Sequence, residues 1–161
     1  MINNRRIHAN IVSLWISAFI VAAIIVYVLD MQISPYQVDS YVVTTDKNYY
    51  DVMHDLRFAV SDENFNITAI NHIGEVIAER NNHAAYPHYA VISACNLEIA
   101  KKFLDIDPEF IAYMPCRIAV WEQHDEINIM TELLPEDDAR CGQLCIHMNQ
   151  RLKKIIDYAA K

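Results

Sequence analysis

The four cysteines of this 161-residue chain are the side chains best suited to covalent or metal chemistry: Cys95, Cys116, Cys141 and Cys145. An even number of cysteines in an oxidising compartment is compatible with disulfides. Cys141 and Cys145 are four positions apart. On a continuous helix their Cβ atoms would lie about 5–6 Å apart, whereas a disulfide needs about 3.8 Å. A bond between these two cysteines would therefore require a locally distorted helix.

The cysteines allow three interpretations. We favour the first, in which all four are small buried hydrophobic residues, because Cys141 and Cys145 fall on the apolar face of the last expected helix. In the second, one disulfide joins Cys141 or Cys145 on that helix to a strand. In the third, the thiols form a metal or redox site. These alternatives stay open.

Two histidines, His83 and His88, flank the loop HAAYPH. This spacing could hold a transition metal or supply a haem ligand, but no third ligand is identifiable from the sequence. A solvated or hydrogen-bonded histidine is the commoner outcome. We therefore predict no metal site and no cofactor, and keep haem or a transition metal at His83 and His88 as the alternative.

Glycine is scarce in this chain, with only Gly74 and Gly142. Phosphate-binding loops and nucleophile elbows need glycine for backbone reasons, and no G-x-S-x-G sequence is present. We therefore predict no catalytic residues and favour a function other than catalysis.

Residues 11–29 contain no charged side chain over 19 positions. At about 1.5 Å per residue, such a helix nearly matches the ~30 Å hydrocarbon core of a bilayer. Trp15 and Tyr27 lie near its two ends, as interfacial aromatic residues would. The residues that follow lack the small-residue pattern of a signal-peptide cleavage site. We therefore predict a permanent transmembrane helix over 11–29.

The charges beside this segment predict its orientation. Arg5 and Arg6 precede it and Asp30 follows it, so the positive-inside rule keeps residues 1–10 in the cytoplasm. We expect a single-pass protein of the inner (cytoplasmic) membrane, with a linker over 30–37 and a periplasmic domain over 38–161. Of 13 basic residues, two lie in the tail, which leaves 11 against 21 acidic residues. This excess of negative charge argues against nucleic acid as a partner.

Hydrophobic periodicity divides the exported part into strands and helices. The expected strands cover 38–45, 65–73, 89–95, 117–123 and 127–133. One helix is expected after Asp46, and two more cover 74–80 and 97–104. The last expected helix begins at 135–138. The order β-α-β-α-β-α-β-β-α predicts an α/β (α+β-like) domain, in which helices pack on a mixed sheet.

Three segments carry a family resemblance: Tyr86-Pro87-His88-Tyr89 leading to Ala94-Cys95-Asn96, the Asp107-Pro108 turn, and Met114-Pro115-Cys116-Arg117. With the helix end at Asn64-Phe65, they resemble the domain-of-unknown-function 302 family over about 38–161. The resemblance implies a small α/β domain that is often dimeric, with no general activity established. It supplies no catalytic residues, and neither the N-terminal anchor nor the pair Cys141 and Cys145 belongs to the pattern.

The leading functional hypothesis is a membrane-anchored, non-catalytic accessory or binding module. Its expected partners are the membrane and either other subunits of a larger membrane complex, respiratory or electron-transfer, or a second copy of itself. The alternative is a thiol-, metal- or haem-dependent redox or ligand-binding protein that uses Cys95, Cys116 and the His83–His88 loop.

Overall fold

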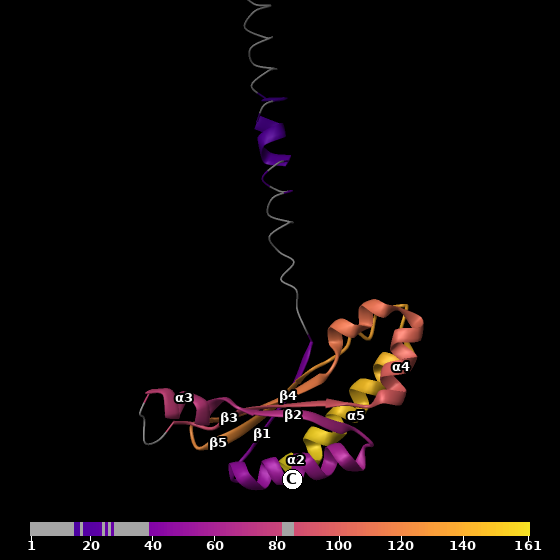
Figure 1. The fold of residues 1–161 in the computed structure, drawn as a ribbon. Coiled ribbons are helices and arrows are strands. Elements are labelled where there is room, and N and C mark those ends of the chain that lie inside the picture. The colour runs from indigo at the N-terminus through magenta and orange to yellow at the C-terminus, as the bar shows by residue number, and fades with distance from the viewer. Residues whose placement is uncertain (1–14, 17, 24, 26, 28–38, 82–85) are drawn as a thin grey trace, which may run out of the picture. The chain divides into compact units, whose positions relative to one another are not determined.

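The structure, a computed structural model, describes residues 15–16, 18–23, 25, 27, 39–81 and 86–161. It divides into two units, Met1–Gln37 and Val38–Lys161, which are described separately (Figure 1).

In the first unit, every described residue between 15 and 27 is helical. The apolar side chains there are exposed: Trp15 by 73%, Phe19 by 78% and Tyr27 by 65%. No helix among the described residues is both long and apolar enough to cross a bilayer. The remainder of the predicted span, the tail over 1–10 and the linker over 30–37 lie outside the described residues.

The second unit contains strands and helices in the predicted order. The strands are β1 (Ser40–Thr45), β2 (Asn66–His72), β3 (Tyr89–Cys95), β4 (Cys116–Gln123) and β5 (Glu126–Glu132). The helices are α2 (Tyr49–Asp62), α3 (Ile73–Asn81), α4 (Leu97–Ile106) and α5 (Gln143–Ala160), with a 3-10 helix, η1 (Pro108–Tyr113), after α4. The predicted order is confirmed, and the 3-10 helix is an addition to it.

The described strands form one sheet in the order β1-β5-β4-β3-β2, and every neighbouring pair is antiparallel. The predicted mixed sheet is therefore wrong. The reason is that α3 and α4 do not cross the sheet. Each lies at one end of it and joins two neighbouring strands, as a long turn would (Figure 1).

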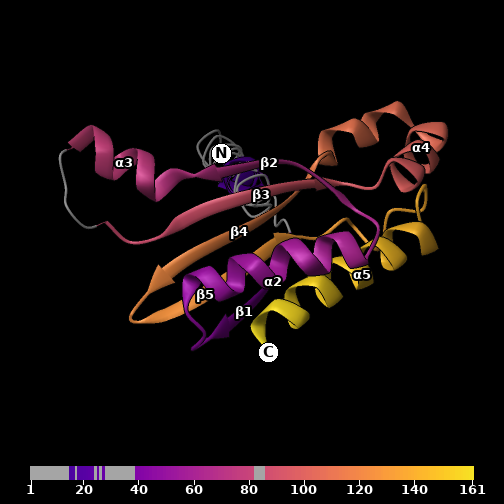
Figure 2. The same cartoon turned by 60° about the horizontal axis from the view of Figure 1, so that its bottom comes forward.

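The two ends of the sheet have different compositions. At the sulfur end, β3 finishes at Cys95 and β4 begins at Cys116, and α4 and η1 lie beyond them. At the histidine end, β2 finishes at His72, and His88 directly precedes β3. Helices α2 and α5 run between the two ends, side by side on one face of the sheet (Figure 2).

The core lies between that sheet face and the two helices. Strand residues alternate in burial: Ala90, Ile92 and Ala94 of β3 are buried, whereas the residues between them are partly exposed. The nearly continuous apolar run of β3 is therefore fully buried on one face of the sheet only. The fully buried side chains of α2 and α5 include Val52, Leu56, Val60, Leu152 and Ile156.

Local backbone signals explain most helix ends. Asn96 caps α4, because its Oδ1 accepts a hydrogen bond from the Ile99 N–H at 3.0 Å. Asn64 takes the left-handed conformation expected after a helix, with φ of 61°. The cap of α2 is Asn48 rather than the expected Asp46.

Candidate functional site

A small cavity lies at the sulfur end of the sheet, and four of its lining residues, from four segments, contain sulfur. Its volume is about 20 Å³. It is lined by Cys95, Asn96, Ile99, Ala100, Phe103, Tyr113, Met114, Cys116, Leu134 and Met148. Cys95 ends β3, Met114 follows η1, Cys116 begins β4 and Met148 lies on α5. The cavity is thus a meeting point of residues far apart in the sequence.

Strand pairing and one asparagine hold the two cysteines at this position. Cys116 lies opposite Ala94 in the β3–β4 ladder, one residue before Cys95. The next residue, Asn96, caps α4 and donates from Nδ2 to the Asn64 carbonyl at 2.9 Å. These bonds fix the turn from β3 into α4, and so the position of Cys95.

Both of these cysteines are free thiols and partly exposed. Burial, and after it the neighbouring Cys95, raises the pKa of Cys116 to about 11. Burial also raises the pKa of Cys95. Because the thiolate is the nucleophile, both groups are weak nucleophiles at neutral pH. The environment does not favour thiol catalysis.

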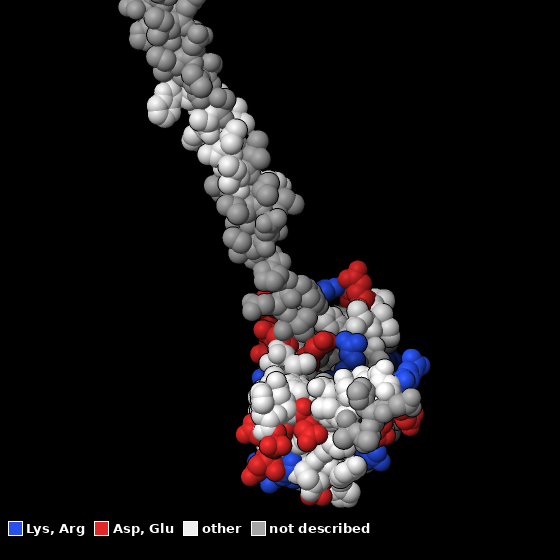
Figure 3. Space-filling model, turned by 90° about the vertical axis from the view of Figure 1, so that its left-hand side faces the viewer, with Lys and Arg blue, Asp and Glu red and all other residues white. Residues whose placement is uncertain are grey.

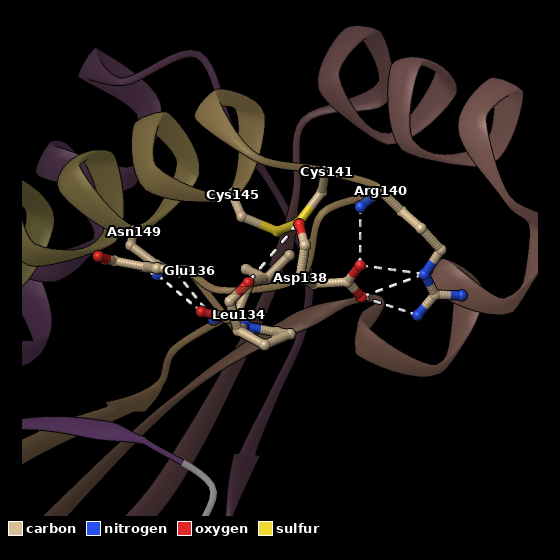
Figure 4. Close-up of a disulfide and its surroundings, with 8 residues drawn as sticks. Leu134, Glu136, Asp138, Arg140, Cys141, Cys145 and Asn149 are labelled. Carbon is tan, nitrogen blue, oxygen red and sulfur yellow. Dashed lines mark hydrogen bonds and ion pairs between the residues drawn. A yellow bond between two sulfur atoms is a disulfide. The ribbon is translucent and has the colours of Figure 1, made fainter.

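The other two cysteines form a disulfide, Cys141–Cys145, with a Cα–Cα distance of 5.5 Å (Figure 4). The favoured reading of four unpaired cysteines is therefore wrong for this pair, and no strand takes part in the bond. The geometric condition is met, because the two cysteines do not share a continuous helix. Helix α5 begins only at Gln143, so Cys141 lies in the preceding turn.

That turn is closed by the backbone. The N–H groups of Cys141 and Gly142 both donate to the Asp138 carbonyl, at 3.2 and 3.0 Å. Gly142 has φ of +43°, a conformation that glycine adopts at little cost. The expected helix start at 135–138 is replaced by this compact turn.

A buried asparagine, Asn149, fixes the segment before the turn to α5 (Figure 4). Its Oδ1 accepts from the Leu134 N–H at 2.9 Å, and its Nδ2 donates to the Leu134 carbonyl at 2.9 Å. Nδ2 also donates to Glu136 at 3.0 Å. Asn149 was not among the candidate residues predicted from the sequence. Its signal there is that it is a polar residue on the otherwise apolar face of α5.

Arg140 neutralises acidic residues from two turns. Its guanidinium pairs with Asp107, Glu109 and Asp138 at 2.6, 3.2 and 2.7 Å. It also lies 5.0 Å from the centre of the Phe110 ring. The Glu109 N–H and then Arg140 hold the pKa of Asp107 below its usual value, and Arg140 does the same for Asp138. The carboxylates of Asp107 and Asp138 thus have a structural role, because through Arg140 they hold the two turns together.

His72 and His88 lie away from the cavity, at the histidine end of the sheet. His88 stacks on Tyr49 with ring centres 4.1 Å apart, and His72 Nδ1 lies 3.3 Å from the Tyr49 hydroxyl. His83 lies outside the described residues. Since His88 and Cys95 are seven positions apart along an extended strand, their Cα atoms lie about 23 Å apart, too far for the two residues to bind one ion. Among the described residues, no group of three or more His, Cys, Asp or Glu side chains could hold a metal.

Comparison with known proteins shows the family to which the domain belongs. The family model "Domain of unknown function DUF302" matches residues 41–157. The chain belongs to the DUF302 family. A crystal structure titled "uncharacterized conserved protein DUF302 from Bacillus stearothermophilus" is similar in fold, with a TM-score of 0.66 and 15% sequence identity. The match covers 76% of this chain and 98% of that one. Among curated proteins, none matches the sequence.

Proposed function

We propose that this DUF302 protein is a membrane-anchored, non-catalytic accessory or binding module whose domain lies outside the cytoplasm. The observation that carries the proposal is the exposure of large apolar side chains on the described helical residues from Trp15 to Tyr27. An apolar surface of this kind needs lipid or a protein partner to cover it. The uncharged run over 11–29 is long enough to provide that anchor.

The Cys141–Cys145 disulfide supports export independently of the anchor. Disulfides persist in oxidising compartments and are rare in the cytosol. The positive-inside rule makes the same assignment, because Arg5 and Arg6 precede the apolar run and Asp30 follows it. Together they favour a cytoplasmic N-terminus and a periplasmic domain.

Surface charge supports a partner other than nucleic acid. The chain has 21 acidic and 13 basic residues. Acidic side chains are spread over the domain face drawn in Figure 3. Such a surface repels phosphate. We propose that the domain docks on a larger membrane complex, respiratory or electron-transfer in type, or on a second copy of itself.

Topology and assembly are tested separately on the full chain. A reporter that is active only outside the cytoplasm, fused after Lys161, should be active. Exchange of the flanking charge in Arg5→Glu/Arg6→Glu should reduce that activity, whereas Arg117→Glu in the domain is the matched control and should not. Mild-detergent extraction and native gels should show a species larger than one chain. A cytoplasmic reporter contradicts the orientation, and a lone migrating chain contradicts the subunit role.

A second candidate is a thiol-dependent metal-binding or redox protein. The convergence of Cys95 and Cys116 on one cavity favours it. Its haem form, with His83 and His88, receives no such support, because His88 stacks on Tyr49 at the opposite end of β3. Purification from native membranes, followed by metal analysis and an absorbance spectrum, tests this candidate. Protein free of metal and chromophore contradicts it.

A further inference from the structure

Strand β1 forms one edge of the sheet and has no partner strand on its outer side among the described residues (Figure 2). Proteins protect such edges with charged side chains, proline or bulges, because unpaired backbone groups bind other strands. The opposite edge, β2, has this protection, since its register with β3 shifts between Ile67 and Ala69. Strand β1 has none of it. Its sequence, SYVVTT, contains neither a charge nor proline, and its register with β5 is unbroken.

The ladder between β1 and β5 shows which backbone groups of β1 point outward. The Leu133 N–H donates to the Asp39 carbonyl, so these two residues form a hydrogen-bonded pair. Bonded and non-bonded pairs alternate along an antiparallel ladder. The backbone groups of every second residue therefore face away from the sheet, at Ser40, Val42 and Thr44. None of these outward groups is bonded to another part of the described chain.

We propose that the β1 edges of two copies of this chain pair antiparallel about a two-fold axis at Val42, which joins the two sheets into one. The outward residues are spaced symmetrically about Val42. Val42 therefore lies opposite Val42 of the second copy, and Ser40 lies opposite Thr44. Each bonded pair exchanges two hydrogen bonds, which gives about six across the axis. The inference rests on the proposed docking role, for which it names the partner and the surface.

The side chains of the edge support this register. Val42 is 46% exposed and lies on the sheet face that α2 and α5 leave open. It continues a row formed with Met130 of β5 and Ala119 of β4. In the paired sheet this row runs on into that of the second copy, and the two Val42 side chains cover each other. Ser40 and Thr44 meet as a pair of hydroxyl side chains, which is a favourable cross-strand pair.

The charges beside the edge also suit a second copy. Helix α5 packs on β1, where Asp157 accepts a hydrogen bond from the Tyr41 hydroxyl at 2.7 Å. Lys153, four positions earlier on α5, has its Nζ 5.7 Å from the centre of the Tyr41 ring. A two-fold axis at Val42 reverses the direction of α5 in the second copy. Because this flank carries one cation and one anion, the reversed flank places opposite charges near each other.

Cross-linking in the full chain tests the register. In a Cys95→Ser/Cys116→Ser background, Val42→Cys should form an intermolecular disulfide on a non-reducing gel, because the paired Cα atoms lie about 5.5 Å apart. Thr44→Cys should not, because Thr44 of the second copy lies four residues further along the strand, about 13 Å away. Ala69→Cys on the exposed edge β2 is the matched control and should also remain unlinked.

Light scattering of the purified full chain in detergent tests the assembly and should give a dimer. Val42→Lys places two ammonium groups at the axis and should raise the dimer dissociation constant at least about tenfold. Val42→Pro removes an N–H that lies outside the β1–β5 ladder, a position where an edge strand tolerates proline, and should have the same effect. Ala69→Lys, the matched control on β2, should leave the dimer unchanged.

The outcomes separate this inference from the proposed function. A purified chain that is monomeric overturns the β1 pairing and leaves docking on other membrane subunits standing. A dimer unaffected by Val42→Lys overturns the pairing, as does equal cross-linking of Val42→Cys and Thr44→Cys. If the Cys95→Ser/Cys116→Ser background does not fold, light scattering of Val42→Lys against Ala69→Lys decides. A cytoplasmic reporter contradicts the proposed orientation alone.

Discussion

The sulfur end and the histidine end of the sheet are stabilised in different ways. At the sulfur end, α4, η1 and the turn before α5 bury Phe103, Phe110 and the disulfide. At the histidine end, α3 buries only Gly74, and the partly exposed His88 stacks on the buried ring of Tyr49. The sulfur end therefore completes the hydrophobic core, whereas the histidine end is attached to it.

This difference arises from how each connection is held. The segment from Leu134 to Gly142 bonds to α5 through Asn149 and closes with a covalent bond. Helix α3 is held by close backbone approach, since a Cβ at Gly74 would lie against the Pro87 carbonyl and 2.9 Å from the Tyr89 nitrogen. Substitutions should therefore cost more stability at the sulfur end.

Asn149→Ala should have the largest effect. It leaves the Leu134 N–H and carbonyl without their partner in a fully buried position. We expect a loss of about 3 kcal/mol in the free energy of unfolding, because each such buried group costs about 1–3 kcal/mol. Urea unfolding followed by circular dichroism measures it. The control is Asn81→Ala on exposed α3, which removes the Nδ2 bond to the Ile77 carbonyl and should cost under about 0.5 kcal/mol.

The second-largest loss of stability is expected when the disulfide is removed. Cys141→Ala/Cys145→Ala removes a covalent link that closes a very short loop. The chain-entropy estimate for a loop of this size gives a loss of about 2 kcal/mol. Thermal and urea unfolding of the oxidised wild type and the double variant measure the loss. Equal stability of the two proteins would show that the turn is held by Asn149 and the backbone bonds alone.

The third prediction concerns pH and compares two acids, Glu63 directly after α2 and Asp55 within it. Lys154 and Arg151 hold the pKa of Glu63 below its usual value, and Lys47 does the same for the more exposed Asp55. A lowered folded-state pKa stabilises the protein above the ordinary carboxyl pKa, and this contribution is lost as pH falls through the lowered value. Glu63→Gln should therefore cost about 1 kcal/mol at pH 7 and little at pH 3.

Stability of the wild type and of Glu63→Gln, measured from pH 7 to pH 3, tests this expectation. Asp55→Asn, in the middle of α2, is the matched variant, and its pH-dependent loss should be smaller. A pH-independent difference between the wild type and Glu63→Gln would exclude the ion pairs with Arg151 and Lys154 as its cause.

The smallest effect is expected at His88. His88→Ala removes the ring stacked on Tyr49, a contact worth about 0.5–1.5 kcal/mol. The loss should lie at the lower end of that range, because His88 is only partly buried. Urea unfolding measures it. A loss larger than that of Asn149→Ala would reverse the comparison between the two ends.

The order of elements was predictable because periodicity and caps are local. Strand β3 and the first residue of α4 were predicted at their observed positions. Sheet pairing is not local. Whether a helix such as α4 crosses the sheet or stays at one end depends on packing against η1 and α5, and this is why the mixed sheet was wrong.

The same limit applies to the candidate site. Cys95 and Cys116 were identified as chemically interesting residues, but their approach depends on the β3–β4 pairing. Met114 and Met148 reach the cavity from η1 and α5, and no spacing in the sequence links them. Cys141–Cys145 was misread because the predicted helix began too early, at 135–138 instead of Gln143.

The position of β1 has a mechanical consequence. The Leu133 N–H donates to the Asp39 carbonyl just before β1, and the Thr45 hydroxyl at its other end donates to the Ala160 carbonyl, next to the C-terminus. A pull between the start of β1 and Lys161 therefore runs along the strand. It shears the whole β1–β5 ladder at once instead of unzipping it bond by bond, a geometry that resists tension on a tether.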